Sequence, residues 1–159
     1  MKLEKMLKLG VILVVSISLL TGCDISNRIY YDNSKIIKDY DSLNIDMIEE
    51  TAGDATYSAI LKLSGSATIW KYESDKDITL KAPYDLLVKS GKAKIVLISP
   101  DNKITTLIES SGESVGRKTS VFKLNIKKGY NRIKLVGYEK ADIDLEIHIE
   151  IGEFQEIDF

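Results

Sequence analysis

The sequence predicts an all-β fold, an antiparallel β-sandwich of the jelly-roll type, and two observations lead to that prediction. Residues 142–151 (DIDLEIHIEI) alternate apolar and polar side chains without a break, a pattern that no helix produces. Other short apolar stretches recur roughly every 8–12 residues and are separated by Gly, Pro, Asn or Ser, as in sandwiches. A flattened barrel is the alternative architecture.

The composition is that of an ordinary globular chain. The 159 residues include 22 basic and 24 acidic side chains, and 44% are hydrophobic, which suits one domain with a sizeable core. The chain has no basic cluster, so we expect no nucleic-acid partner. It has one Cys and one His, which exclude an intrachain disulfide and argue against a Cys- or His-based metal site. We therefore expect no metal and no cofactor.

Residues 1–22 have the features of a secretion signal. Three lysines precede an uncharged stretch of 12 residues, 9–20, which is too short to span a bilayer as a stable helix. The stretch ends in Leu20-Thr21-Gly22-Cys23, which resembles the lipobox of bacterial lipoproteins. The resemblance implies that Cys23 is diacylated and becomes the first residue of a mature chain on the extracytoplasmic face of the cell membrane. An uncleaved anchor with a chance Cys is the alternative.

The mature chain would be acidic, so the lipid and not the protein's own charge would hold it at the membrane. Residues 23–42 are polar, and we expect a flexible tether there that holds the domain some 25 Å from the lipid. The β-sandwich domain then covers residues 43–159. The stretches 90–107 and 131–137 resemble those of small surface lipoproteins of Gram-positive bacteria, and the Ile- and Lys-rich, Arg-poor usage is similar to that of an AT-rich Gram-positive genome.

The strands are expected in the following order along the domain: 43–49, 57–63, 67–73, 78–81, 84–89, 94–99, 104–109, 121–126, 131–137 and 142–151. Residues 95–98 are all apolar, as in a central strand that is covered on both faces. Pro100 to Lys103 predicts a turn in which Asn102 tolerates the left-handed region. Gly129 predicts a second turn, which would make 121–126 and 131–137 a hairpin. Residues 110–118 are expected to form a surface loop.

The polar face of the last strand carries Asp142, Asp144, Glu146 and Glu150, with His148 exposed between the last two. We expect these carboxylates to pair with Arg132 and Lys134 on the preceding strand. Calcium bound by this face is a weaker alternative, because carboxylates two residues apart on a strand lie too far apart to converge on one ion. Glu73, Asp75 and Asp77, in a loop, are a slightly better cation site, but a solvated turn is expected there.

Trp70 and Tyr72 are the candidate ligand-binding aromatics. Alternation predicts that both project from one face of their strand together with Thr68, opposite Ile69. Trp70 would either anchor the core or form with Tyr72 a flat platform for a sugar or a hydrophobic partner. We favour the core, because a strand that is apolar on both faces belongs inside a sandwich. Tyr84, Tyr130 and Tyr138 are expected near strand ends.

The segment from Ile126 to Leu135 (IKKGYNRIKL) resembles the late hairpin of jelly-roll carbohydrate-binding modules. The resemblance covers ten residues and implies a fold, but no binding residues are carried over. No catalytic motif is present, so we expect a non-enzyme. The favoured function is a membrane-anchored, non-catalytic β-sandwich for recognition or structure at the cell surface, with a protein or glycan partner. The alternative is a true carbohydrate-binding module; a transporter's solute receptor is disfavoured, since no βαβ pattern occurs.

Overall fold

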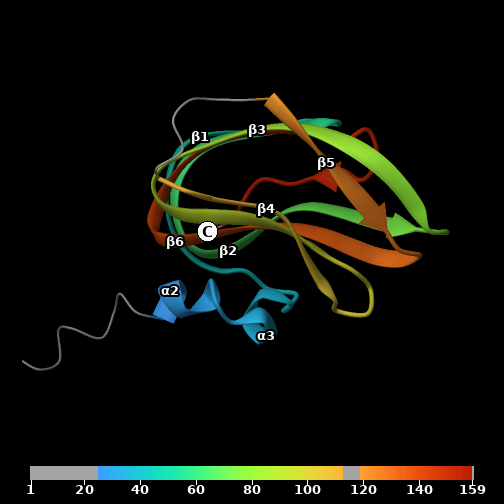
Figure 1. The fold of residues 1–159 in the computed structure, drawn as a ribbon, viewed down its shortest axis with the longest axis horizontal. Coiled ribbons are helices and arrows are strands. Elements are labelled where there is room, and N and C mark those ends of the chain that lie inside the picture. The colour runs from blue at the N-terminus through green and yellow to red at the C-terminus, as the bar shows by residue number, and fades with distance from the viewer. Residues whose placement is uncertain (1–24, 113–118, 159) are drawn as a thin grey trace, which may run out of the picture.

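A computed structural model describes residues 25–112 and 119–158 of the chain, and these form an antiparallel β-fold with two short helices (Figure 1). The elements are α2 (Ile25–Ile29), α3 (Asn33–Ile36), β1 (Ser42–Ala52), β2 (Thr56–Ser74), β3 (Ile78–Ile98), β4 (Ile104–Ser111), β5 (Thr119–Ile126), β6 (Gly129–His148) and β7 (Glu153–Phe154). The predicted all-β class and the antiparallel pairing are confirmed.

Three long strands, β2, β3 and β6, replace seven of the short strands that the sequence suggested. Along the sheet the order is β1-β2-β6-β3-β4, and β6 lies between β2 and β3 over nearly its whole length. β2 and β3 bend, so the two halves of each have different outer neighbours: β5 pairs with 78–85 of β3 and β4 pairs with 92–98, whereas β1 and β7 pair with different parts of β2. Figure 1 shows how this curvature folds the sheet back over itself into two layers.

Glycines make the sharp bend sterically possible. Gly65 of β2 lies directly opposite Gly137 of β6 in the ladder. A Cβ at Gly137 would lie 2.3 Å from the carbonyl oxygen of Leu63, and a Cβ at Gly65, which has φ of +107°, would lie 2.1 Å from that of Ser42. Only glycine fits such close backbone approaches, so these positions, which the sequence suggests as breaks between strands, act as corners within strands.

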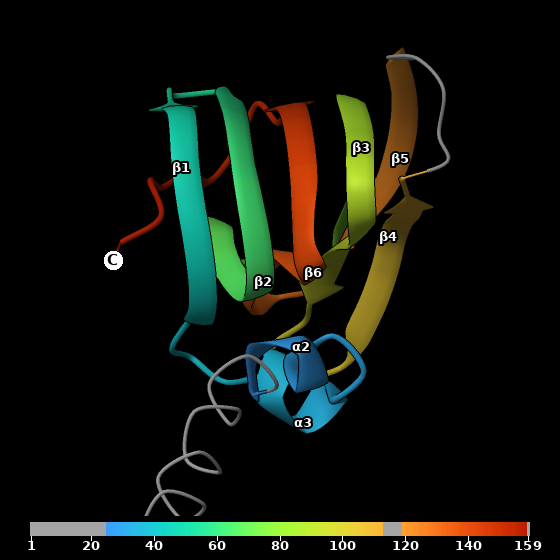
Figure 2. The ribbon, with the colours of Figure 1, turned by 90° about the vertical axis from the view of Figure 1, so that its left-hand side faces the viewer.

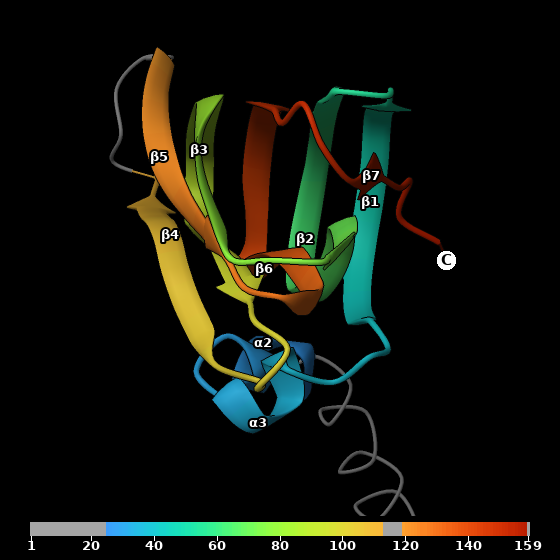
Figure 3. The ribbon, with the colours of Figure 1, turned by 90° about the vertical axis from the view of Figure 1, so that its right-hand side faces the viewer.

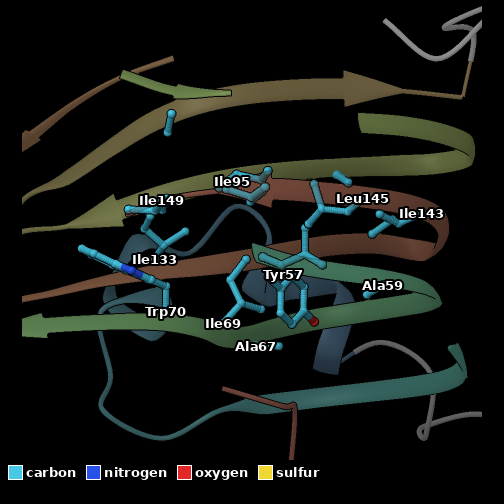
Figure 4. Close-up of a cluster of buried hydrophobic side chains, with 14 of the residues drawn as sticks. Tyr57, Ala59, Ala67, Ile69, Trp70, Ile95, Ile133, Ile143, Leu145 and Ile149 are labelled. Atoms are coloured by element: carbon cyan, nitrogen blue, oxygen red, sulfur yellow. The ribbon is translucent and has the colours of Figure 1, made fainter. Parts of the chain in front are cut away.

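The main core fills the space between the two layers. It contains the alternating apolar residues of β6, including Ile143, Leu145 and Ile147, which face side chains from β2 and β3 (Figure 4). The predicted alternation of the last strand is thus confirmed. The stretch 95–98 is buried throughout, as predicted: Ile95 and Leu97 belong to this core, and Val96 and Ile98 face the opposite side of the sheet.

The outer face of the sheet at Val96 and Ile98 is covered by the N-terminal segment. Ile29 and Tyr30 at the end of α2 and Ile36 of α3 are buried against it, and they form a second apolar cluster. In Figures 2 and 3 both helices lie against one end of the sheet. The flexible tether expected at 23–42 is therefore wrong for residues 25–41, because apolar side chains within this polar segment cover a face of the sheet that would otherwise be exposed.

Buried cations of the sheet hold the backbone of this segment. Lys134 Nζ donates to the carbonyls of Lys38 and Tyr40 at 2.9 and 3.0 Å, and it pairs with Asp41 at 3.0 Å. Arg132 donates to the carbonyl of Ile37 at 2.9 Å and pairs with Asp39. We define Ile25 to Asp41, with its two helices, as the N-terminal clasp.

The two predicted turns have different outcomes. The turn at Pro100–Lys103 joins β3 to β4 as a hairpin, and Asn102 has φ of 60°, as predicted. Gly129 also has the expected positive φ, but the hairpin after it is wrong: β5 pairs with β3, whereas β6 pairs with β2 and β3. The chain crosses between layers here, and the buried Asn131 holds the crossing by donating to the carbonyls of Lys127 and Gly129.

Candidate functional site

The candidate binding site is an open groove of about 490 Å³ at the end of β2, where that strand lies beside the start of β6 and beside β7. Two tyrosines, three charged side chains and a glycine line it: Tyr72, Tyr130, Lys71, Glu73, Glu153 and Gly152. Strand pairing assembles the groove, because Glu73 lies opposite Tyr130, and Lys71 lies opposite Glu153.

Tyr72 enters the groove from the edge of the core. Its ring is half-buried, and its centroid lies 5.9 Å from that of the Trp70 indole. Trp70 itself is fully buried, and its Nε1 donates to the carbonyl of Ile151 at 2.8 Å. Trp70 is therefore a core anchor, and the platform hypothesis is wrong for it, because no face of the indole reaches solvent.

A β-bulge in β2 explains the altered arrangement of faces around Trp70. The pairing of β2 with β6 shifts by one residue between Thr68 and Trp70, so both Ile69 and Trp70 enter the core. Thr68 faces the other side of the sheet, where its backbone N and Oγ1 both donate to Asp41. Trp70 and Tyr72 do share a face, as predicted, but Thr68 does not share it, because the extra residue of the bulge reverses the alternation between Thr68 and Trp70.

Tyr130 supplies the more exposed ring of the groove. It is 42% exposed, and the Arg132 guanidinium carbon lies 5.9 Å from its centroid. Partial burial raises the pKa of the Tyr130 phenol, and the nearby Arg132 opposes that shift. The phenol is thus protonated at neutral pH and is able to donate a hydrogen bond.

The groove combines features suited to a polyhydroxylated or peptidic ligand. Aromatic rings offer flat apolar contact area with a polar tip, and Lys71, Glu73 and Glu153 offer donors and acceptors of both signs. The sequence pattern singled out Tyr72 but not its partner. Tyr130 is 58 positions away in the chain, and only the register of β2 with β6 places it beside Tyr72.

A second hollow, of about 360 Å³, contains the histidine. It is lined by Leu80, Lys81, Pro83, His148, Glu150 and Ile151. His148 is half-buried, and its Nδ1 lies 3.2 Å from Thr56 Oγ1, so the expectation of a fully exposed ring is corrected. The neighbouring strand β2 partly covers the ring.

The predicted charge pairing of the last strand is also corrected. Arg132 and Lys134 do not face Asp142, Asp144, Glu146 or Glu150; they bind the N-terminal clasp instead. The reason is topological: residues 131–137 and 142–148 are successive parts of one strand, β6, so they cannot lie opposite each other as hairpin partners.

The structure gives Asp77, one of the acidic positions considered for calcium, a different role. Asp77 accepts from Lys127 Nζ at 2.6 Å and from the backbone N of Lys128 at 2.8 Å, and these bonds lower the pKa of its carboxyl. It thus fixes the β5–β6 crossing. Across residues 25–112 and 119–158, no group of three or more His, Cys, Asp or Glu side chains is arranged to hold a metal ion.

The lipobox residues Leu20, Thr21 and Gly22 and the lipidation candidate Cys23 lie outside the described residues, as does most of the predicted 110–118 loop. In the part of the chain that the structure describes, no helix is both long and apolar enough to cross a membrane.

The fold and the groove together define an antiparallel β-sandwich with an aromatic-lined groove, and we compared it with known proteins. No protein-family model matches the chain, and no curated protein matches it either. Among solved structures, it is similar to a family 29 carbohydrate-binding module variant, with a TM-score of 0.42, 11% identity, and coverage of 69% of this chain and 92% of the module.

Two further solved structures are similar at the same level. A second variant of that module, in complex with mannohexaose, gives a TM-score of 0.40 and 11% identity over 69% of this chain and 89% of the module. An exo-β-1,3-galactanase from Phanerochaete chrysosporium, with galactose, gives 0.37 and 14% identity over 67% of this chain and 29% of the enzyme. Likenesses of this degree do not define a family, and the functional argument below rests on the chain's own residues.

Proposed function

We propose that this chain is a membrane-anchored protein of the extracytoplasmic face, whose β-sandwich is a non-catalytic recognition module. Two features support the proposal. The sequence Leu20-Thr21-Gly22-Cys23 follows an apolar signal and supplies the anchor. The observation that carries the recognition role is the open groove with Tyr72 and Tyr130, which offers aromatic and charged contacts to a partner.

Under this proposal the groove and α2, the anchored end of the clasp, lie at opposite ends of the first half of β6. Tyr130 begins the first half of β6, and Tyr138, which contacts the clasp, ends it. Eight residues of extended strand separate them, or about 26 Å. A lipid anchor just before α2 would therefore lie some distance from the groove, which leaves its rings accessible to envelope polymers or proteins.

The anchor is tested by replacing its nucleophile. Cys23→Ser should abolish incorporation of labelled fatty acid and prevent lipoprotein-type cleavage, because serine cannot form the thioether. The wild-type protein should fractionate with membranes. Wild-type protein that takes up no fatty acid and is found free in the medium would contradict the anchor.

Glycan binding is the second candidate function, and the pairing of two tyrosines with charged side chains in one groove favours it. Stacking on an aromatic ring and hydrogen bonds from charged groups are the two contacts that a sugar ring needs. Because the Trp70 indole contacts the ring of Tyr72, a ligand in the groove should perturb Trp70 emission without touching it.

The experiment compares matched tyrosine variants. Soluble oligosaccharides and isolated cell-wall polymers are titrated into wild type, Tyr130→Ala and Tyr40→Ala, and Trp70 emission is recorded. Tyr40 is 66% exposed and does not line the groove, so it serves as the control. Glycan binding predicts a response in wild type and Tyr40→Ala that is lost in Tyr130→Ala. No response to any glycan, together with capture of a protein partner that Tyr130→Ala abolishes, would favour protein recognition instead.

A further inference from the structure

We infer that the domain docks directly on the bilayer surface, with Tyr31, Tyr138 and Lys92 in contact with lipid headgroups. The inference rests on the proposed lipid anchor at Cys23 and goes beyond it: a lipid anchor alone would leave the orientation of the domain free, whereas this docking fixes it. We call these three residues the aromatic patch.

The first step is the length of chain available between the lipid and the fold. Only residue 24 separates Cys23 from Ile25, where α2 begins. Two Cα–Cα steps of 3.8 Å place the Cα of Cys23 within about 8 Å of the Cα of Ile25. A diacylated Cys23 would thus hold α2 at the membrane surface.

The second step is that α2 is part of the folded domain. The side chains of Ile29 and Tyr30 are 2% and 1% exposed against the sheet. Tyr30 Oη donates to Glu109 at 2.6 Å, and Lys94 Nζ donates to the Tyr30 carbonyl at 2.7 Å. In the middle of the helix, Asn27 Oδ1 accepts from the backbone N of Glu139 at 2.9 Å. Because these contacts fix α2 to the sheet, an anchor that holds α2 at the membrane also holds the sandwich close to it.

The third step is the chemistry of the surface beside α2. Tyr31 follows α2 and is 64% exposed, and its ring lies 5.5 Å from that of the half-buried Tyr138. The exposed Lys92 lies 6.0 Å from the Tyr138 centroid, and its Nζ is 3.5 Å from Tyr31 Oη. Tyrosine favours the membrane–water interface, because its ring is apolar and its tip is polar. Lys92 attracts lipid phosphates, and the exposed Glu139 carboxylate beside Tyr138 offsets part of that attraction, so the rings make the main contribution.

The backbone between Cys23 and Tyr31 is short enough to keep the aromatic patch close to the lipid anchor. From Cys23 to Tyr31 the backbone spans at most about 20 Å, made up of the helical rise of α2 and two short extended ends. Tyr31 lies within this distance of the anchor, and Tyr138 and Lys92 lie beside Tyr31. The headgroup zone of one leaflet is about 5–7 Å deep, which matches the length of a tyrosine side chain.

The experiment places a fluorescent probe at single positions of the full-length acylated protein. Because the thiol of Cys23 is consumed by acylation, a new cysteine is the sole reactive thiol. Tyr31→Cys and Lys92→Cys probe the patch. Ile48→Cys and Val121→Cys, at positions that are 66% and 56% exposed on β1 and β5, are the matched controls (Figure 2 shows β5 and the helices apart). Each labelled protein is reconstituted into vesicles of phosphatidylcholine and phosphatidylglycerol.

Docking predicts that a quencher carried on the lipids quenches the probe at position 31 or 92 severalfold more than the probe at 48 or 121. Soluble iodide should show the reverse order. Equal quenching at all four positions in vesicle-bound protein would overturn the docking but leave the anchor intact. Protein that does not sediment with vesicles, and that carries no fatty acid, would overturn the anchor and the docking with it.

Discussion

Trp70 is the side chain whose removal should cost the fold most. It is fully buried between the layers, and its Nε1 hydrogen bond satisfies the carbonyl of Ile151. Trp70→Ala should lower the free energy of unfolding by about 3–5 kcal/mol, because apolar transfer energy is lost and a cavity remains. Chemical denaturation measures this loss. In the wild type, Trp70 emission should be blue-shifted and insensitive to iodide; ready quenching in the folded protein would show that the indole is exposed.

The ion pair of the buried Lys134 with the partly buried Asp41 holds the clasp, so removal of the anion should lower stability markedly. The Lys134 side chain is fully buried, and burial lowers its pKa, whereas Asp41 also accepts two bonds from Thr68. Asp41→Ala should lower the free energy of unfolding by about 3 kcal/mol or more, because it leaves the buried Lys134 cation without its anion. Lys134→Met should cost less, because an apolar chain of similar length replaces the charge.

An exposed ion pair supplies the control for Asp41. Lys140 and Asp46 lie 3.8 Å apart with side chains that are 59% and 62% exposed, so solvent screens them. Asp46→Ala should change stability by no more than about 0.5 kcal/mol. If Asp41→Ala costs as little as Asp46→Ala, the clasp is not held by this pair.

At the scale of the element, the bend of β6 at Gly137 should tolerate no side chain. A Cβ there would meet backbone and side-chain atoms of Leu63 on β2, which cannot move without breaking the ladder. We expect Gly137→Ala to cost about 1–3 kcal/mol, the usual effect of overpacking. Gly53→Ala is the matched control, because its Cβ would make only an ordinary contact of 3.4 Å. Thermal melts of the two variants compare the sites, and equal melting temperatures would contradict a tight corner.

Element boundaries also explain where sequence patterns failed. Alternation identified the segments that pair, but it divided β2, β3 and β6 at the glycines and serines of their bends. A turn between two strands and a corner within one strand use the same residues, because both need close backbone approach. Local sequence cannot distinguish a turn from a corner. The continuous pairing of β2 and β6 on both sides of Gly65 and Gly137 shows that these glycines form corners within strands.

For the whole molecule, stability should fall at alkaline pH because of two buried tyrosines. Tyr57 donates to Glu50 and Tyr30 donates to Glu109, both at 2.6 Å, and burial, followed by these bonds, raises each phenol's pKa well above its usual value of 10. Above pH 10 the unfolded chain releases protons that the folded chain keeps. The free energy of unfolding should then fall by up to about 1.4 kcal/mol per pH unit for each tyrosine.

The buried lysines change the free energy of unfolding with pH in the opposite direction to the buried tyrosines. Burial lowers the pKa of Lys94 and Lys134, so their contribution to stability rises with pH until the unfolded lysines also lose their protons near pH 10.5. Above that pH the tyrosine effect stands alone. Denaturation of wild type and Tyr57→Phe between pH 8 and 11 tests it: the variant should lose stability less steeply, and identical slopes would contradict the assignment to Tyr57.

The sequence by itself determined the fold class and the local periodicities. The alternation at 142–151, the buried stretch at 95–98 and the turn at Asn102 are properties of neighbouring residues, so their spacing reveals them. The lipobox pattern is equally local, and the anchor at Cys23 remains a prediction from it.

Only the tertiary structure decided which faces meet. It shows that Tyr130 lies beside Tyr72 and that a bulge places Trp70 on the opposite face from Thr68. It also shows that part of the segment expected to be a flexible tether packs against the sheet as the N-terminal clasp. Each of these depends on pairing between residues far apart in the chain. Arg132 and Lys134 look like solvent-facing residues of an alternating strand, and they are buried because a segment some 90 positions earlier covers them. Periodicity reports that a side chain leaves one face of a strand; what lies against that face is set by long-range packing.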